Sequence, residues 1–103
     1  MALPDDEPEV PEKPDEAELQ LAFELGESGL RNVDDALKRA TDGRYRKVAL
    51  IIVRALKLLE IRASDPYVNL CVRRLQELVN EGVLDAHGNV RCPRRSEVRL
   101  RPH

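Results

Sequence analysis

The sequence predicts a mainly helical domain that ends in a small antiparallel β-hairpin. Three observations carry this prediction. Apolar residues recur at helical spacing in four segments between residues 15 and 81. Gly82 then provides a left-handed stop signal, and residues 83–101 contain a Gly-Asn turn signal and a short alternating segment. A chain of 103 residues suffices for one domain with one modest core.

Composition excludes several classes of protein. The chain is 42% hydrophobic and 35% charged, and its longest apolar run, 48–53, is far shorter than the ~18 residues of a membrane span. The acidic, Pro-rich N-terminus is neither a signal peptide nor a transit peptide. Two cysteines cannot form a disulfide scaffold, so we expect a cytoplasmic protein with no membrane contact.

Charge is distributed unevenly along the chain. Residues 1–18 hold eight acids and one base, whereas residues 19–103 hold 16 bases and 11 acids. The Pro-rich segment 1–14 has almost no apolar content, so we expect a disordered acidic arm there and a folded domain over residues 15–103. The arm has two interpretations: a solubilising tail, or a segment that folds back onto basic surface or competes for a polyanion partner.

Two short helices are predicted first. Asp15 can cap the first helix, with Glu18 at capping-box spacing, and Gly26 and Gly29 end it. The second begins at residue 32 or 34 and ends at Ala40.

Two longer helices follow. Residues 44–60 carry a broad apolar arc, which indicates a central helix packed by more than one neighbour. Asp65 as N-cap and Pro66 in the first turn start the next helix, which is predicted over 66–81 and ends before Gly82. Its inward face is predicted to consist of Tyr67, Val68, Cys71, Val72, Leu75, Leu78 and Val79.

The C-terminal segment predicts a hairpin. The turn signal 87–89 lies between apolar residues, Pro93 interrupts the returning strand, and residues 97–101 alternate strictly. Helices followed directly by a hairpin are the pattern of a winged helix, in which the third helix precedes the wing. We therefore expect a winged-helix-like fold.

The chain also resembles an uncharacterised family of bacterial domains of unknown function. The resemblance covers residues 34–100, about two-thirds of the chain, and implies a winged-helix-like shape without an established activity. In that family the domain often follows another domain. The residues that carry the resemblance are Tyr45, Arg46, Lys47, Arg74, Leu75, Glu77, Leu78, Gly82, Gly88, Asn89 and the segment 96–100.

One polar stripe on the helix 66–81 points to nucleic acid, most simply DNA in a regulatory role. Asn69, Arg73, Gln76 and Asn80 are spaced so that they line one side of that helix. These residue types bind base edges, and the third helix of a winged helix enters the major groove. Flanking arginines would contact phosphates, although Glu77 interrupts the stripe. The candidate nucleic-acid-binding residues are Asn69, Arg73, Arg74, Gln76, Asn80, Arg91, Arg94 and Arg95.

The alternative is a protein-interaction or dimerisation module. Lys47, Arg54 and Lys57 form a basic strip on the central helix. Leu50 falls within this strip, and Leu70 lies off the main apolar arc of the next helix. Such leucines can form a dimer or heteromer patch, and the helix around Leu19 and Phe23 could dock on its own domain or on a neighbour.

Catalytic and metal chemistry have little support. The soft ligands Cys71, His87, Cys92 and His103 lack the paired spacing of zinc sites, so we expect no metal and no cofactor. Cys92 and His87 lie five residues apart, but no orienting third group accompanies them, so we expect no enzyme activity.

Overall fold

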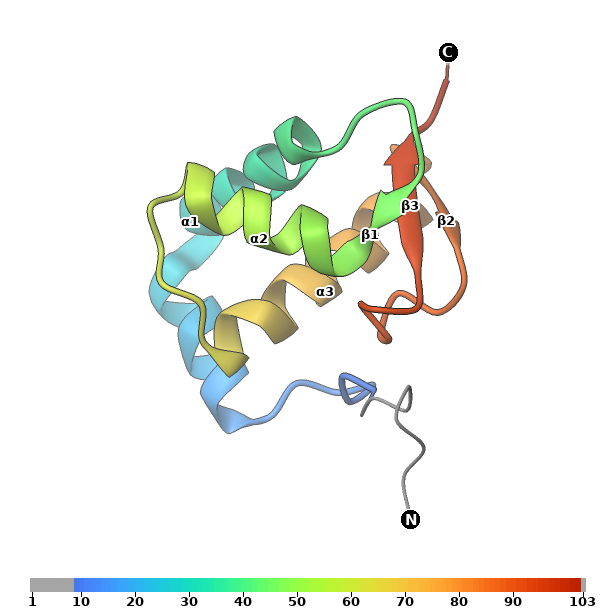
Figure 1. Cartoon of the computed structure of the whole chain (residues 1–103). Helices are drawn as coiled ribbons and strands as arrows, with labels where there is room; N and C mark the ends of the chain where they lie inside the picture. The colour runs from blue at the N-terminus through green and yellow to red at the C-terminus, as the bar shows by residue number, and fades with distance from the viewer. Residues whose placement is uncertain (1–8, 103) are drawn as a thin grey trace.

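Within residues 9–102, three helices pack together, and a small three-stranded antiparallel sheet lies at one end of them (Figure 1). The computed structural model describes residues 9–102. The prediction of a mainly helical domain with a C-terminal β-hairpin is confirmed. The elements are α1 (Glu16–Ala40), β1 (Arg46–Lys47), α2 (Val48–Leu58), α3 (Asp65–Asn80), β2 (Leu84–His87) and β3 (Glu97–Leu100).

Helix α1 joins the two helices that the sequence predicts before residue 41. Asp15 is the N-cap, as predicted, and its carboxylate accepts a hydrogen bond from the backbone N of Glu18 at 2.9 Å. Gly26 leaves the helical region, with φ of 65° and ψ of -174°, and kinks the helix. The predicted stop at Gly29 is wrong, because the helix continues through it. A Cβ at Gly29 would lie 2.7 Å from the Cβ of Leu25, so glycine permits close packing there.

The helix predicted over 44–60 is shorter at both ends. It spans Val48–Leu58 as α2, and the two residues before it form β1, which pairs antiparallel with β3. A two-residue strand has no periodicity of its own, because it depends on a partner far away in the sequence. The predicted apolar arc is buried at Val48, Ile51, Ile52, Ala55 and Leu56, but Val53, which was predicted to extend it, is 50% exposed.

Helix α3 begins and ends close to its predicted bounds. The prediction that Asp65 is the N-cap is wrong, since Ser64 holds that position and its Oγ accepts a hydrogen bond from the backbone N of Tyr67 at 3.4 Å. Asp65 is the first helical residue, where its negative charge is favourable beside the helix dipole. The helix ends at Asn80, and Gly82 adopts the predicted left-handed conformation with φ of 80°.

Strands β2 and β3 form the predicted hairpin with a longer connection. His87 lies opposite Glu97, and Gly88 has φ of 81°, as the turn requires. Residues 88–96 do not return directly as a strand. The loop is held against the domain instead, because the backbone N of the first α2 residue donates a 3.0 Å hydrogen bond to the carbonyl of Ser96.

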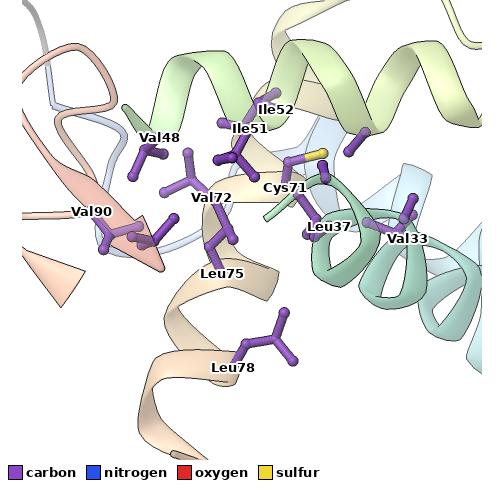
Figure 2. Packing of buried hydrophobic residues seen from close by; sticks show 14 of the residues in the cluster. Val33, Leu37, Val48, Ile51, Ile52, Cys71, Val72, Leu75, Leu78 and Val90 are labelled. Carbon is purple, nitrogen blue, oxygen red and sulfur yellow. The ribbon is translucent and has the colours of Figure 1, made fainter. Parts of the chain in front are cut away.

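One core joins all three helices to the sheet. Leu75 and Val72 of α3 belong to one cluster with Leu37 of α1 and Ile51 of α2 (Figure 2), and each of these four side chains is at most 1% exposed. The predicted inward face of α3 is therefore confirmed at its central positions. Its outer members Tyr67, Val68 and Val79 are partly buried and pack against this cluster.

Cys71 belongs to this core, as predicted. Its sulfur lies among carbon side chains (Figure 2), and burial raises the pKa of the Cys71 thiol to about 12. Cys71 and Cys92 are both free thiols.

Leu70 is the main correction to the predicted surface of α3. Leu70 is only 3% exposed, so the prediction that it contributes to a patch of exposed leucines is wrong. Leu50, the other leucine of that predicted patch, is 40% exposed. Arg73 and Arg74, the next residues on that side of α3, both bind carboxylates of α1. That side of the helix is covered by α1, which widens the buried arc beyond the one that periodicity indicates.

Candidate interaction surface

The described part of the acidic arm lies on the domain. Of the segment 1–14 that the sequence predicts to be disordered, residues 1–8 lie outside the described residues. The arm segment, as we call residues 9–14, is placed against the folded part. Val10 is 8% exposed, and its backbone N donates to the carbonyl of Arg91 at 2.8 Å. One buried apolar side chain and a few hydrogen bonds hold this stretch, although composition favours disorder.

Arg91 binds the arm segment from the loop between β2 and β3. Its guanidinium lies 3.2 Å from a carboxylate oxygen of Glu9 and 3.5 Å from one of Glu12. It also donates a 3.3 Å hydrogen bond to the carbonyl of Val10. Residues 9–14 therefore follow the interpretation in which the acidic arm folds back onto basic surface of the domain.

Arg73, the central residue of the predicted base-reading stripe, is engaged within the chain. Its Nε lies 3.0 Å from Oε2 of Glu18, its Nη2 lies 3.3 Å from Oε1, and its Nη1 donates to the carbonyl of Glu12 at 3.0 Å. The Arg73 side chain is 15% exposed and that of Glu18 only 3%. Glu18 therefore does not reach back to close a capping box, because its carboxylate serves this pair.

Arg74 is engaged in the same way. Its Nε and Nη2 donate bidentate hydrogen bonds to the two carboxylate oxygens of Asp34, at 2.8 and 2.9 Å. This hydrogen-bonded carboxylate raises the pKa of Arg74 further, so the charge is permanent and largely neutralised. Asp34, predicted to start a helix, lies inside α1 and anchors α3 to it.

The amide residues of the predicted site form a polar rather than a basic surface. Asn69 and Gln76 are half-buried and Asn80 is exposed, and the exposed carboxylates of Glu77 and Glu81 lie beside them. Gln76 and Asn80 line a hollow of about 330 Å³ together with Glu77, Gly88 and Asn89. Arg94 and Arg95 are exposed on the loop between β2 and β3.

The first half of α1 presents an exposed apolar face with acidic borders. Phe23 is 83% exposed and Leu19 is 56% exposed. They are four residues apart and so lie on one side of the helix. Glu16 and Glu24, both exposed, border them. We call these four residues the acidic face.

Helix α2 presents an apolar face with basic borders. Leu50 is 40% exposed and Leu58 is 47% exposed, with Arg54 and Lys57 between them. We call these four residues the basic face. Beside it, at the end of α1, lies a hollow of about 440 Å³ lined by Leu58, Arg54, Lys57, Arg39, Ala40, Thr41 and Asp42.

An aromatic stack at the sheet was not predicted from the sequence. The rings of Tyr45 and His87 are parallel within 15°, with centroids 3.8 Å apart, and the Arg99 guanidinium lies 4.7 Å from the Tyr45 centroid. His87, considered above beside Cys92 as a catalytic pair, is thus a packing residue of the sheet. His87 of β2 and Arg99 of β3 come close together because these two strands pair antiparallel. The cluster that they form with Tyr45 could therefore be predicted only from the strand register.

Comparisons with family models, with curated proteins and with solved structures found no match. The resemblance noted from the sequence therefore stays a prediction. Within residues 9–102, no helix is long and apolar enough to cross a membrane, and no three His, Cys, Asp or Glu side chains form a group that could hold a metal.

Proposed function

We propose that this chain is a protein-interaction module of winged-helix-like shape that associates with a second copy of itself. The order of helix, short strand, two helices and hairpin, with β1 pairing to β3, supports that shape. The two free cysteines support a reducing compartment such as the cytoplasm, which we include in the proposal.

One observation carries the self-association: the chain exposes two faces that match in both polarity and charge. The acidic face places Phe23, 83% exposed, between carboxylates. The basic face places Arg54 and Lys57 between the exposed Leu50 and Leu58, beside a hollow of about 440 Å³. In the proposed contact, Phe23 of one copy enters this hollow on another, whose lining carries the bases Arg39, Arg54 and Lys57 and one acid, Asp42. Aromatic anchors in pockets with complementary charge at the rim are typical of protein interfaces.

The charges of α3 favour this function over DNA binding at that helix. Arg73, Arg74 and Arg91 each have carboxylate partners within the chain. Glu77 of α3 and Glu81, the residue directly after this helix, are exposed. A helix entering the major groove would place these carboxylates near the phosphate backbone, where like charges repel.

Sedimentation equilibrium from about 10 μM to about 1 mM tests the proposal. The wild-type chain is expected to self-associate in this range, and Phe23→Ser is expected to weaken association by at least about tenfold, since it removes the anchor. Arg44→Ser, at an exposed loop position outside both faces, is the matched control. A wild-type chain that remains monomeric throughout contradicts the proposal.

Nucleic-acid binding, which the sequence predicts first, becomes the second candidate; the amide side chains of Asn69, Gln76 and Asn80 and the exposed Arg94 and Arg95 favour it. Titration of mixed duplex DNA at about 50 and 200 mM salt tests it, because phosphate contacts give binding that falls steeply with salt. Replacement of Arg94 and Arg95 by alanine should then flatten the salt dependence. Lack of binding at the lower salt concentration excludes this candidate.

A further inference from the structure

An apolar groove beside Val10 is only partly filled by that side chain. The groove has a volume of about 290 Å³ and lies between α2, the start of α3 and the loop between β2 and β3. Its wall includes Ile52, Leu56, Val68 and Pro93. Val10 lines the groove and is itself 8% exposed. Space therefore remains beside the valine that a longer aliphatic side chain would fill.

The arm segment shows which contacts an extended peptide makes at this groove. The backbone N of Val10 donates to the carbonyl of Arg91, and the Arg91 guanidinium donates to the carbonyl of Val10. The same guanidinium binds the carboxylates on both sides of the valine, Glu9 and Glu12. Pro11 biases the residue before it toward extended backbone. Main-chain hydrogen bonds combined with a side-chain pocket are a recurring mode of peptide recognition.

We propose that this groove binds an extended acidic peptide of another protein, and that the arm segment occupies the site until that peptide displaces it. The sequence it recognises has an acidic residue, an aliphatic residue larger than valine, any residue, and a second acidic residue. Val10 and the groove lie apart from Phe23 and the hollow beside Leu58, so this inference does not depend on self-association through those faces.

Tethering explains how a weak occupant keeps the groove closed. A segment joined by a short linker has an effective concentration of about 1 mM, so an intrinsic dissociation constant of about 0.1 mM keeps the arm bound about nine-tenths of the time. The arm segment of a second copy carries the same residues but is not tethered to this groove. At protein concentrations below about 1 mM, the chain's own arm segment therefore occupies the groove in preference to that of a second copy. A peptide with leucine at the position of Val10 adds one buried methylene, which is worth about a fourfold gain in affinity.

Peptide binding to the full chain with a displaced arm tests the inference. Val10→Asp places a charge in the apolar groove and should release the arm. The probe is a fluorescein-labelled peptide of residues 5–14 with Val10→Leu, followed by anisotropy and by amide shifts of the groove residues. The Val10→Asp chain should bind this probe at least about tenfold more tightly than the wild-type chain. The natural peptide should bind about fourfold more weakly than the probe.

Two controls keep the result interpretable. Lys13→Ser, at an exposed position of the arm segment, should bind the probe as weakly as the wild-type chain. If Val10→Asp reduces folding in circular dichroism, the Glu9→Lys, Glu12→Lys chain replaces it, because repulsion from Arg91 also releases the arm.

Three results would overturn the inference. Equal affinity of the wild-type and released chains would show that the arm does not occupy the peptide site. Absence of amide shifts at about 5 mM probe would show that the groove does not accept a peptide in trans, since the arm itself needs a dissociation constant near 0.1 mM. A wild-type dimer that Val10→Asp abolishes would show that the occupant is the arm of a second copy.

Discussion

The two sides of α3 follow different physical rules. The inward side is apolar, and Cys71, Val72 and Leu75 are each 0% exposed. The side that the sequence predicts to face outward is polar, and its two arginines bind carboxylates of α1 that lie 55 and 40 residues away in the sequence. Burial follows the local helical period, whereas ion pairing depends on where distant segments come to lie. Residue type and spacing therefore predict the core more reliably than they predict which charges are available to a partner.

The largest expected effect lies on the inward side. Leu75→Ala should lower the free energy of unfolding by about 2–5 kcal/mol, because it removes a fully buried side chain and leaves a cavity. Leu50→Ala, at a position 40% exposed, should cost less than about 1 kcal/mol and is the control. Denaturant unfolding at low micromolar concentration measures both. If the two substitutions lower the free energy of unfolding equally, the burial of Leu75 does not stabilise the fold.

The next effect lies on the outward side. Arg73→Ala should lower the free energy of unfolding by about 1–3 kcal/mol, because it leaves the Glu18 carboxylate, whose side chain is 3% exposed, without its guanidinium. The double variant with Glu18→Ala should cost less than the sum of the two single variants. Arg31→Ala breaks a pair whose side chains are 71% and 91% exposed, and should cost less than about 0.5 kcal/mol. A cost for Arg73→Ala as small as that of Arg31→Ala would show that the outward pair does not stabilise the fold.

A smaller effect distinguishes the buried thiol. Burial raises the pKa of Cys71 from 9.0 to about 12, so the folded chain keeps a proton that the unfolded chain releases above about pH 9. Stability should therefore fall as pH rises through this window, by at most about 1.4 kcal/mol per pH unit. Unfolding of the wild-type chain and Cys71→Ala, compared from about pH 8 to about pH 10.5, isolates this contribution. If the free energies of unfolding of the two chains change with pH in parallel, the Cys71 thiol is not held protonated in the folded state.

Much of the fold could be predicted from local signals in the sequence. The end of α3, the N-cap at Asp15 and the break at Gly26 depend on residues within a few positions of each feature. The strand β1 could not be found, because two residues carry no period and its partner β3 follows two helices later. The connection 88–96 was expected to be shorter, because hydrogen bonds to the distant start of α2 decide its path.

Less of the candidate site could be predicted, for the same reason. The polar stripe on α3 was identified by residue type, but the carboxylates that neutralise Arg73 and Arg74 come from α1. The position of Leu70 depends on the coverage of α3 by α1, which a single helix period does not contain. The exposed Phe23 was visible in the sequence as an apolar residue on a helix, whereas its exposure required the three-dimensional structure.

Complementation between two variants tests directly whether the acidic face of one copy binds the basic face of another. Phe23→Ser damages the acidic face and Lys57→Glu with Leu58→Ser damages the basic face, all at exposed positions. In a solution of either variant alone, every contact between the two faces includes a damaged face. In a mixture, the intact acidic face of the Lys57→Glu, Leu58→Ser chain can bind the intact basic face of the Phe23→Ser chain. Sedimentation equilibrium of the equimolar mixture should therefore show tighter association than either variant alone. If the mixture sediments as the average of its two components, the two faces do not bind one another and the account is contradicted.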